Sequence, residues 1–204
     1  MREVPAPAEF VRALAPALRQ AASIARALEG RVANRPKRGE ATPVKAALTI
    51  ADTAAQEALL VPLWERFPGV CVEAEEDTPS VARFASAGDS LVVIDPIDGT
   101  LRFYLEAGGP YAVMMGLALR REYTAALLAL PREALHFEAV RGEGARIVEG
   151  TGPARPAGLE NSGRRVLVSH DLPRAAVEAL RARDLEVRSA CGGAIAVAPL
   201  IPGV

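Results

Sequence analysis

The chain has 204 residues, half of them hydrophobic, and a formal net charge of −1. This length suits one large domain, or one domain with part of a second, and the apolar content is enough for a substantial core. The near-neutral charge and the lack of a basic, aromatic-rich run argue against a nucleic-acid polymer as partner. The N-terminus lacks the apolar stretch of a secretion signal or membrane span, so we expect a cytoplasmic protein with reduced cysteines.

Two amphipathic helices come first in the chain. Apolar residues recur every three to four positions across residues 6–29, and Gly30 follows the stripe, which predicts the first helix. Residues 50–67 repeat this period, and Pro62 within them predicts a kink. The polar, basic residues 31–43 between the helices are either a solvated connection or a mobile loop over an anionic substrate.

The pattern changes to strands after residue 69. Residues 70–74 and 91–94 are short apolar runs, and residues 111–148 hold four apolar segments separated by turn-like residues, which predicts an antiparallel meander. A Gly/Pro-rich linker follows, and then strand, helix, strand and helix alternate as in an α/β unit. We therefore expect an N-terminal α+β domain over residues 1–150 and a C-terminal α/β subdomain over residues 151–204.

Acidic side chains follow two of these predicted strands. Glu75 comes directly after residues 70–74, whereas Asp95 and then Asp98 follow residues 91–94. If the two strands are parallel neighbours, their carboxyl ends bring the three carboxylates to the edge at which ligands gather in such sheets. Adjoining carboxylates repel one another, and a hard cation such as Mg²⁺ relieves that repulsion. The alternative for the first group is a solvated acidic loop.

The residues around the second aspartate suit phosphate binding. Pro96 stiffens the turn, so the carbonyl of Ile97 can point inward as a further metal ligand. Gly99 lets backbone N–H groups approach an oxyanion, and Thr100 opens a helix whose free N–H groups favour phosphate. The Thr100 hydroxyl could orient an attacking water. The competing interpretation is a plain hairpin turn at Asp98-Gly99.

A third acidic position lies at the start of the second helix. Thr49 precedes Asp52 there, and either residue could cap the helix by accepting hydrogen bonds from its free N–H groups. The functional alternative is that Asp52 accepts a hydrogen bond from the hydroxyl of Thr100, forming a pair that activates water.

Together these motifs resemble the inositol monophosphatase and 3′(2′),5′-bisphosphate nucleotidase superfamily, which is related to fructose-1,6-bisphosphatase. The resemblance rests on "TIAD" at 49–52, "EE" at 75–76, "VIDPIDGT" at 93–100, "GEGA" at 142–145 and "RSACGGAIAVAPL" at 188–200. It implies an α/β fold layered as an αβαβα sandwich, a homodimer, and hydrolysis of a small phosphate monoester by metal-activated water. The substrate implied is inositol monophosphate or a molecule like 3′-phosphoadenosine 5′-phosphate.

The resemblance also implies roles for individual residues. It implies two or three Mg²⁺ ions and inhibition by Li⁺. Carried over by position, the metal ligands are Glu75, Asp95, the Ile97 carbonyl and Asp98, the phosphate is held by Gly99 and Thr100, and water is activated by Thr100 paired with Asp52 or Glu75.

Two alternatives to this activity follow from the sequence. Family members usually continue to a Trp-Asp motif that supplies another aspartate ligand, whereas this sequence ends at Val204. We therefore expect a short C-terminal part, and the alternative function is a weakly active or non-catalytic homologue that binds metal or phosphate. Haloacid-dehalogenase phosphatases share "DGT", but their D-x-D-G-T spacing differs from the spacing of Asp95 and Asp98.

Overall fold

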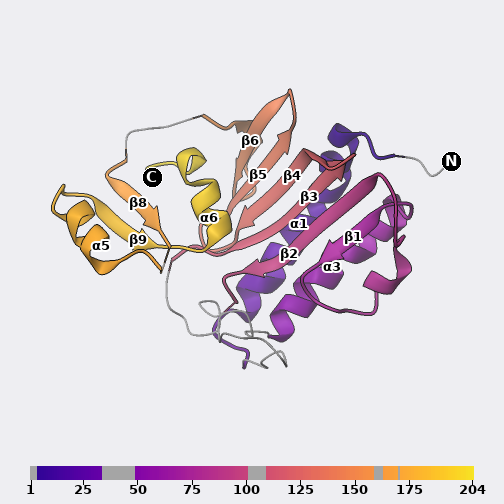
Figure 1. Ribbon diagram of the computed structural model, residues 1–204, viewed down its shortest axis with the longest axis horizontal. Helices are drawn as coiled ribbons and strands as arrows, with labels where there is room; N and C mark the ends of the chain where they lie inside the picture. Colours follow the sequence, from indigo (N-terminus) through magenta and orange to yellow (C-terminus); the bar gives the residue numbers. More distant parts are fainter. Residues whose placement is uncertain (1–3, 34–48, 101–108, 159–162, 170) are drawn as a thin grey trace.

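The computed structural model describes residues 4–33, 49–100, 109–158, 163–169 and 171–204 (Figure 1). These residues form a layered α/β fold, as expected from the sequence. The helices are α1 (Pro7–Leu28), α3 (Ile50–Arg66), α5 (Arg174–Arg181) and α6 (Gly192–Ala196), with short 3₁₀ turns at Val81–Arg83 and Ala198–Leu200. Most of the basic stretch expected between the first two helices, from residue 34 onward, lies outside the described residues.

A seven-stranded sheet forms the centre of the molecule. Its strands are β1 (Cys71–Ala74), β2 (Ser90–Asp98), β3 (Ala112–Leu119), β4 (Glu122–Leu130), β5 (Leu135–Val140), β6 (Gly144–Glu149) and β7 (Arg155–Pro156), in that spatial order. β1 pairs with β2 in parallel, and every later pair is antiparallel. The meander expected from the sequence is therefore confirmed, and the first two strands are parallel neighbours, the condition on which the acidic residues would come together.

The two long helices cover one face of this sheet. Phe10, Leu14 and Leu18, one helical turn apart, are almost completely buried on α1, and they face β3, β4 and β5. α3 packs against α1 and β2. α6 lies on the other face (Figure 1). The sheet thus has the helical pair behind it and α6 in front of it.

The C-terminal part forms a second, smaller sheet. β8 (Arg165–Val168) and β9 (Glu186–Ser189) pair in parallel, and α5 connects them, as the alternation in the sequence predicted. β7 pairs with β6 and so extends the large sheet past residue 150; the division of the chain at that residue stays a prediction.

Three further findings concern the last helix, the two cysteines and the possibility of a membrane span. The helix expected from Gly192 is short and passes into a 3₁₀ turn at Ala198, next to Pro199, which has no N–H to continue an α-helix. Cys71 and Cys191 are both buried free thiols. Among the helices that the structure describes, none has the length and apolar content that a membrane span requires.

Candidate active site at the carboxyl ends of β1 and β2

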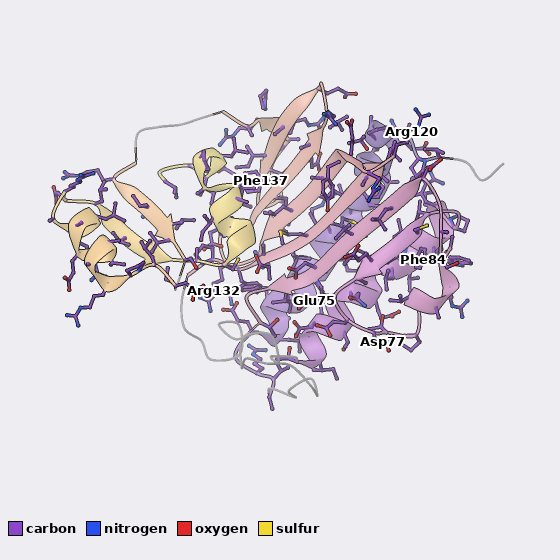
Figure 2. All side chains as sticks on the ribbon, viewed as in Figure 1. Glu75, Asp77, Phe84, Arg120, Arg132 and Phe137 are labelled. Carbon is purple, nitrogen blue, oxygen red and sulfur yellow. The ribbon has the colours of Figure 1, made fainter. Side chains whose placement is uncertain are left out.

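The parallel pairing of β1 and β2 brings two acidic residues together. Ala74 lies opposite Ile94 in the register, and the backbone N–H of Glu75 donates to the carbonyl of Ile94 at 3.1 Å. Glu75, which follows β1 (Figure 2), and Asp95, which follows Ile94 within β2, therefore occupy adjoining positions. The sequence proposed this neighbourhood on the condition that the two strands are parallel, and the structure meets that condition.

The pKa of the Asp95 carboxyl is strongly raised at this edge. Burial, followed by the charges of Glu75 and Asp98, raises the pKa of Asp95 to about 9. The Oδ1 atom of Asp95 is buried and accepts no hydrogen bond from the described residues. The charged groups that act on Asp95 most strongly, including Asp52, are all acidic. A buried carboxylate with an open acceptor and only acidic neighbours is the type of donor that hard cations bind.

Asp98 lies in the same neighbourhood but makes a different contact. A register irregularity in β2 separates Asp95 from Asp98, and Oδ2 of Asp98 accepts a short hydrogen bond from the backbone N–H of Gly193 at the start of α6. Burial and the nearby Asp98 carboxylate raise the pKa of the Cys191 thiol to about 12. Asp98 thus connects the acidic edge to the C-terminal part of the chain.

The described residues contain no group of three or more His, Cys, Asp and Glu side chains gathered closely enough to hold a metal ion. The donor type fits Mg²⁺, and Glu75 and Asp95 adjoin, while one oxygen of the Asp98 carboxylate accepts from the N–H of Gly193. The ligand roles of Glu75, Asp95, Ile97 and Asp98 therefore stay predictions.

Thr100 and Asp52 form the pair that the sequence suggested. The Thr100 hydroxyl lies 2.8 Å from Oδ1 of Asp52 and 3.0 Å from the carbonyl of Ile97, and both oxygens accept from it. Thr100 and Asp52 are both buried although they are polar. The helix that Thr100 was expected to open falls on residues 101–108, which lie outside the described residues.

Asp52 also caps α3, so the two interpretations of this residue hold together. Its Oδ2 atom accepts from the backbone N–H of Thr49 at 2.8 Å and from the Thr49 hydroxyl at 2.7 Å. Thr49 in turn accepts from the N–H of Ala51. Burial raises the pKa of Asp52, while the hydrogen bonds from Thr49 and Thr100 lower it in part. Oδ2 of Asp52 therefore accepts hydrogen bonds at the start of α3, and Oδ1 accepts the hydrogen bond from Thr100.

The backbone at Gly99 requires glycine for two reasons. Its φ of +98° is a conformation that other residues rarely adopt. A Cβ there would lie 3.0 Å from Cβ of Cys191 and 3.7 Å from Cβ of Tyr111. Gly99 is thus enclosed by the chain on both sides, next to the Thr100 hydroxyl. Its expected contact with phosphate stays a prediction.

Two sets of residues near the site were not found from the sequence. Gln56, one turn after Asp52 on α3, bonds to the backbone beyond Glu75. Glu29 accepts from the Tyr111 hydroxyl at 3.2 Å and pairs with Arg132, whose guanidinium also donates to the Gly109 carbonyl (Figure 2). The available signal for Gln56 was a polar residue at a position of α3 where the helical period predicts burial. The second set gives no local signal, because Glu29 and Arg132 lie about a hundred positions apart.

The chain resembles known proteins over most of its length. The model of the inositol monophosphatase family matches residues 7–200. The IMPase of Thermotoga maritima superposes with a TM-score of 0.66 and 22% identity, covering 91% of this chain and 69% of that chain. SuhB of Mycobacterium tuberculosis gives 0.62 and 21%, covering 97% and 75%.

CysQ of Bacteroides thetaiotaomicron, a bacterial member of the same family, gives a TM-score of 0.59 and 22% identity, covering 89% of this chain and 71% of that chain. A comparison with curated proteins found no match. At these identities the structural likeness establishes the fold, and the expected layered α/β architecture is confirmed. Because the family match spans almost the whole sequence, the chain belongs to the inositol monophosphatase family.

Proposed function

We propose that the chain hydrolyses small phosphate monoesters in a Mg²⁺-dependent reaction. The observation that carries this proposal is the buried Thr100–Asp52 pair, with an O–O distance of 2.8 Å, next to the adjoining Glu75 and Asp95. Family membership supports a phosphatase of the inositol monophosphatase type. The proposed substrates are inositol monophosphate or a molecule like 3′-phosphoadenosine 5′-phosphate, and inhibition by Li⁺ and a homodimeric state belong to the same proposal.

In this proposal Glu75, Asp95, Asp98 and the Ile97 carbonyl would hold the ions. When bound, the metal would lower the pKa of the attacking water and stabilise the charge on the leaving oxygen. The open Oδ1 of Asp95 supports this assignment, and Asp98 would bind through the oxygen that does not accept from Gly193. Gly99 would leave room for a phosphate oxygen near the backbone.

Thr100 would orient the attacking water. Its hydroxyl hydrogen is directed to Asp52 or to the Ile97 carbonyl, so the lone pairs of its oxygen remain to accept a hydrogen bond from water. Asp52 would take up the proton that Thr100 relays. Because burial raises the pKa of Asp52, its carboxylate is a better proton acceptor than an exposed aspartate.

The test is phosphate release from a panel of esters, with Mg²⁺ and with a chelator. The panel contains inositol phosphates, fructose bisphosphate, phosphoadenosine phosphate and histidinol phosphate, and Asp95→Asn is the inactive control. Release that requires Mg²⁺ and is lost in the control supports the proposal. Wild-type turnover in Asp95→Asn would overturn the metal assignment.

A second candidate is a weakly active homologue that binds metal or phosphate. The bond between Asp98 and Gly193 favours it, because this bond engages one of the two oxygens of a carboxylate that the enzyme would need for the metal. Calorimetric titration with Mg²⁺, run beside the ester panel, separates the two candidates. Mg²⁺ binding without phosphate release from any ester would support the second.

A further inference from the structure

The side chain of Gln56 holds the backbone that follows Glu75. Its Nε2 atom donates to the carbonyl of Glu76 at 2.6 Å, and its Oε1 atom accepts from the N–H of Glu76 at 3.0 Å. The same Nε2 atom donates to the hydroxyl of Thr78 at 2.9 Å. Gln56 is completely buried. Both amide hydrogens and the amide oxygen are thus committed to one loop, and the side chain has one orientation.

Gln56 lies one helical turn after Asp52, so the two side chains project from the same face of α3. Asp52 accepts the hydrogen bond of Thr100, and Gln56 binds the backbone of Glu76. A single helix face therefore sets two separate parts of the candidate site. Its first turn orients the hydroxyl, and its second turn orients the segment after β1.

This arrangement fixes Glu75 from both sides. Its own N–H donates to Ile94 at 3.1 Å, and the next residue is held by Gln56 through both N–H and carbonyl. The direction in which the Glu75 side chain leaves the backbone is therefore set by β2 on one side and by α3 on the other. Among the charged groups, Glu75 has the largest effect on the pKa of Asp95.

We propose that Gln56 is a positioning residue that holds Glu75 against Asp95 so that the two carboxylates can share a divalent cation. This inference rests on the proposed function, because it names how one arm of that site is oriented. Gln56 touches neither substrate nor metal in this proposal. It acts only through the backbone of Glu76.

The test uses two variants of Gln56 and one matched control. Gln56→Glu keeps the shape and one acceptor but removes the two donated bonds, and Gln56→Met removes all three. Glu57→Gln is the control, because Glu57 bonds to the Ser80 hydroxyl at 2.5 Å, farther along the same loop. Mg²⁺ affinity is measured by calorimetry, and exchange of the Glu76 amide hydrogen is measured by NMR in the absence of metal.

We expect both Gln56 variants to bind Mg²⁺ about 10–100-fold more weakly than the wild type, as found for residues that orient metal ligands. The Glu76 amide hydrogen should exchange faster in Gln56→Met than in the wild type. In the same variant, KM for the ester should change less than kcat. Glu57→Gln should keep the wild-type Mg²⁺ affinity. If Gln56→Met does not fold, the isosteric Gln56→Glu decides the question by the same measurements.

The outcomes separate this inference from the proposed function. A wild type that binds Mg²⁺ and hydrolyses esters, with Gln56 variants that bind Mg²⁺ within twofold of it, would overturn the positioning role alone. A wild type that binds no Mg²⁺ would overturn both proposals. Equal losses of affinity in Glu57→Gln and the Gln56 variants would also overturn the role, because the whole loop and not Gln56 would then be responsible.

Discussion

The hydroxyl oxygen of Thr100 lies 2.8 Å from Oδ1 of Asp52, although 48 positions separate the two residues in the chain. Both are buried, and the second oxygen of Asp52 is engaged by Thr49. The first turn of α3 is therefore connected directly to the end of β2. This link supports the assignment of Thr100 as the residue that orients water.

Removing the Thr100 hydroxyl should affect rate and stability together. We expect Thr100→Ala to lower kcat by about 10²–10⁴-fold, the range for a positioned proton transfer. Because Asp52 loses a buried partner, the free energy of unfolding should fall by about 1–3 kcal/mol. Steady-state kinetics and urea unfolding measure the two effects. Thr100→Ser should retain much of the activity. A Thr100→Ala variant with wild-type kcat would support the competing interpretation of Asp98-Gly99 as a plain turn without a catalytic role.

The raised pKa of Asp95 predicts a pH dependence of stability in the metal-free protein. The folded state holds a proton on Asp95 up to about pH 9, whereas the unfolded chain releases it near the ordinary carboxyl pKa of 3.8. Between these two values the folded state binds more protons, so its stability should fall as pH rises, by at most about 1.4 kcal/mol per pH unit. Urea unfolding in chelator at pH 5, 6.5 and 8 measures the slope.

Asp95→Asn provides the control for this prediction. It removes the titrating group and keeps the shape, so the decline in stability between pH 5 and pH 8 should become smaller. The variant should also be more stable than the wild type at pH 8, because the wild type must take up a proton on Asp95 as it folds and the variant need not. An unchanged slope would mean that other groups produce it.

The close approach of α6 to the large sheet predicts the effect of a single methyl group. A Cβ at Gly193 would lie 2.9 Å from Cβ of Ala112 and 3.0 Å from Oδ2 of Asp98. We expect Gly193→Ala to lower the free energy of unfolding by about 1–3 kcal/mol, because overpacking forces neighbours to shift. Gly158→Ala is the control, since nothing lies within 4 Å of its added Cβ. Equal effects in chemical denaturation would contradict the close packing of α6.

The pair of Glu29 and Arg132 should behave as a buried ion pair. Their side chains are 7% and 19% exposed, and Tyr111 adds a hydrogen bond to Glu29. Among the described residues, Arg132→Met leaves the Glu29 carboxylate with only the more exposed Arg26 as a cationic partner at 3.0 Å, so we expect a loss of at most about 3 kcal/mol in the free energy of unfolding. Adding Glu29→Gln should restore part of this loss.

The exposed pair of Arg174 and Glu178 gives the comparison for this prediction. Its side chains are 92% and 58% exposed, so Arg174→Met should change the free energy of unfolding by less than about 1 kcal/mol. Guanidinium titrations of the single and double variants measure all these values. A similar cost for Arg132→Met and Arg174→Met would show that burial of the first pair contributes nothing.

The sequence by itself determined the elements and the local chemistry of this protein. The apolar period of α1, the capping pattern of Thr49 and Asp52, and the strands ahead of Glu75 and Asp95 all depend on residues close together in the chain. Local periodicity sets which face of an element is buried, so these features follow from order alone. The parallel pairing of β1 and β2 and the bond between Thr100 and Asp52 join distant parts of the chain, and the sequence suggested each of them only as a hypothesis.

Only the tertiary structure decided which partners the buried polar groups would have. Asp98 acts electrostatically on Asp95, and its Oδ2 atom also accepts from the N–H of Gly193, 95 positions later, where α6 packs against β3. Gln56 and Arg132 likewise bind groups that no local pattern indicates. A buried polar group must find a hydrogen-bond partner wherever packing places one, and packing is a property of the whole fold.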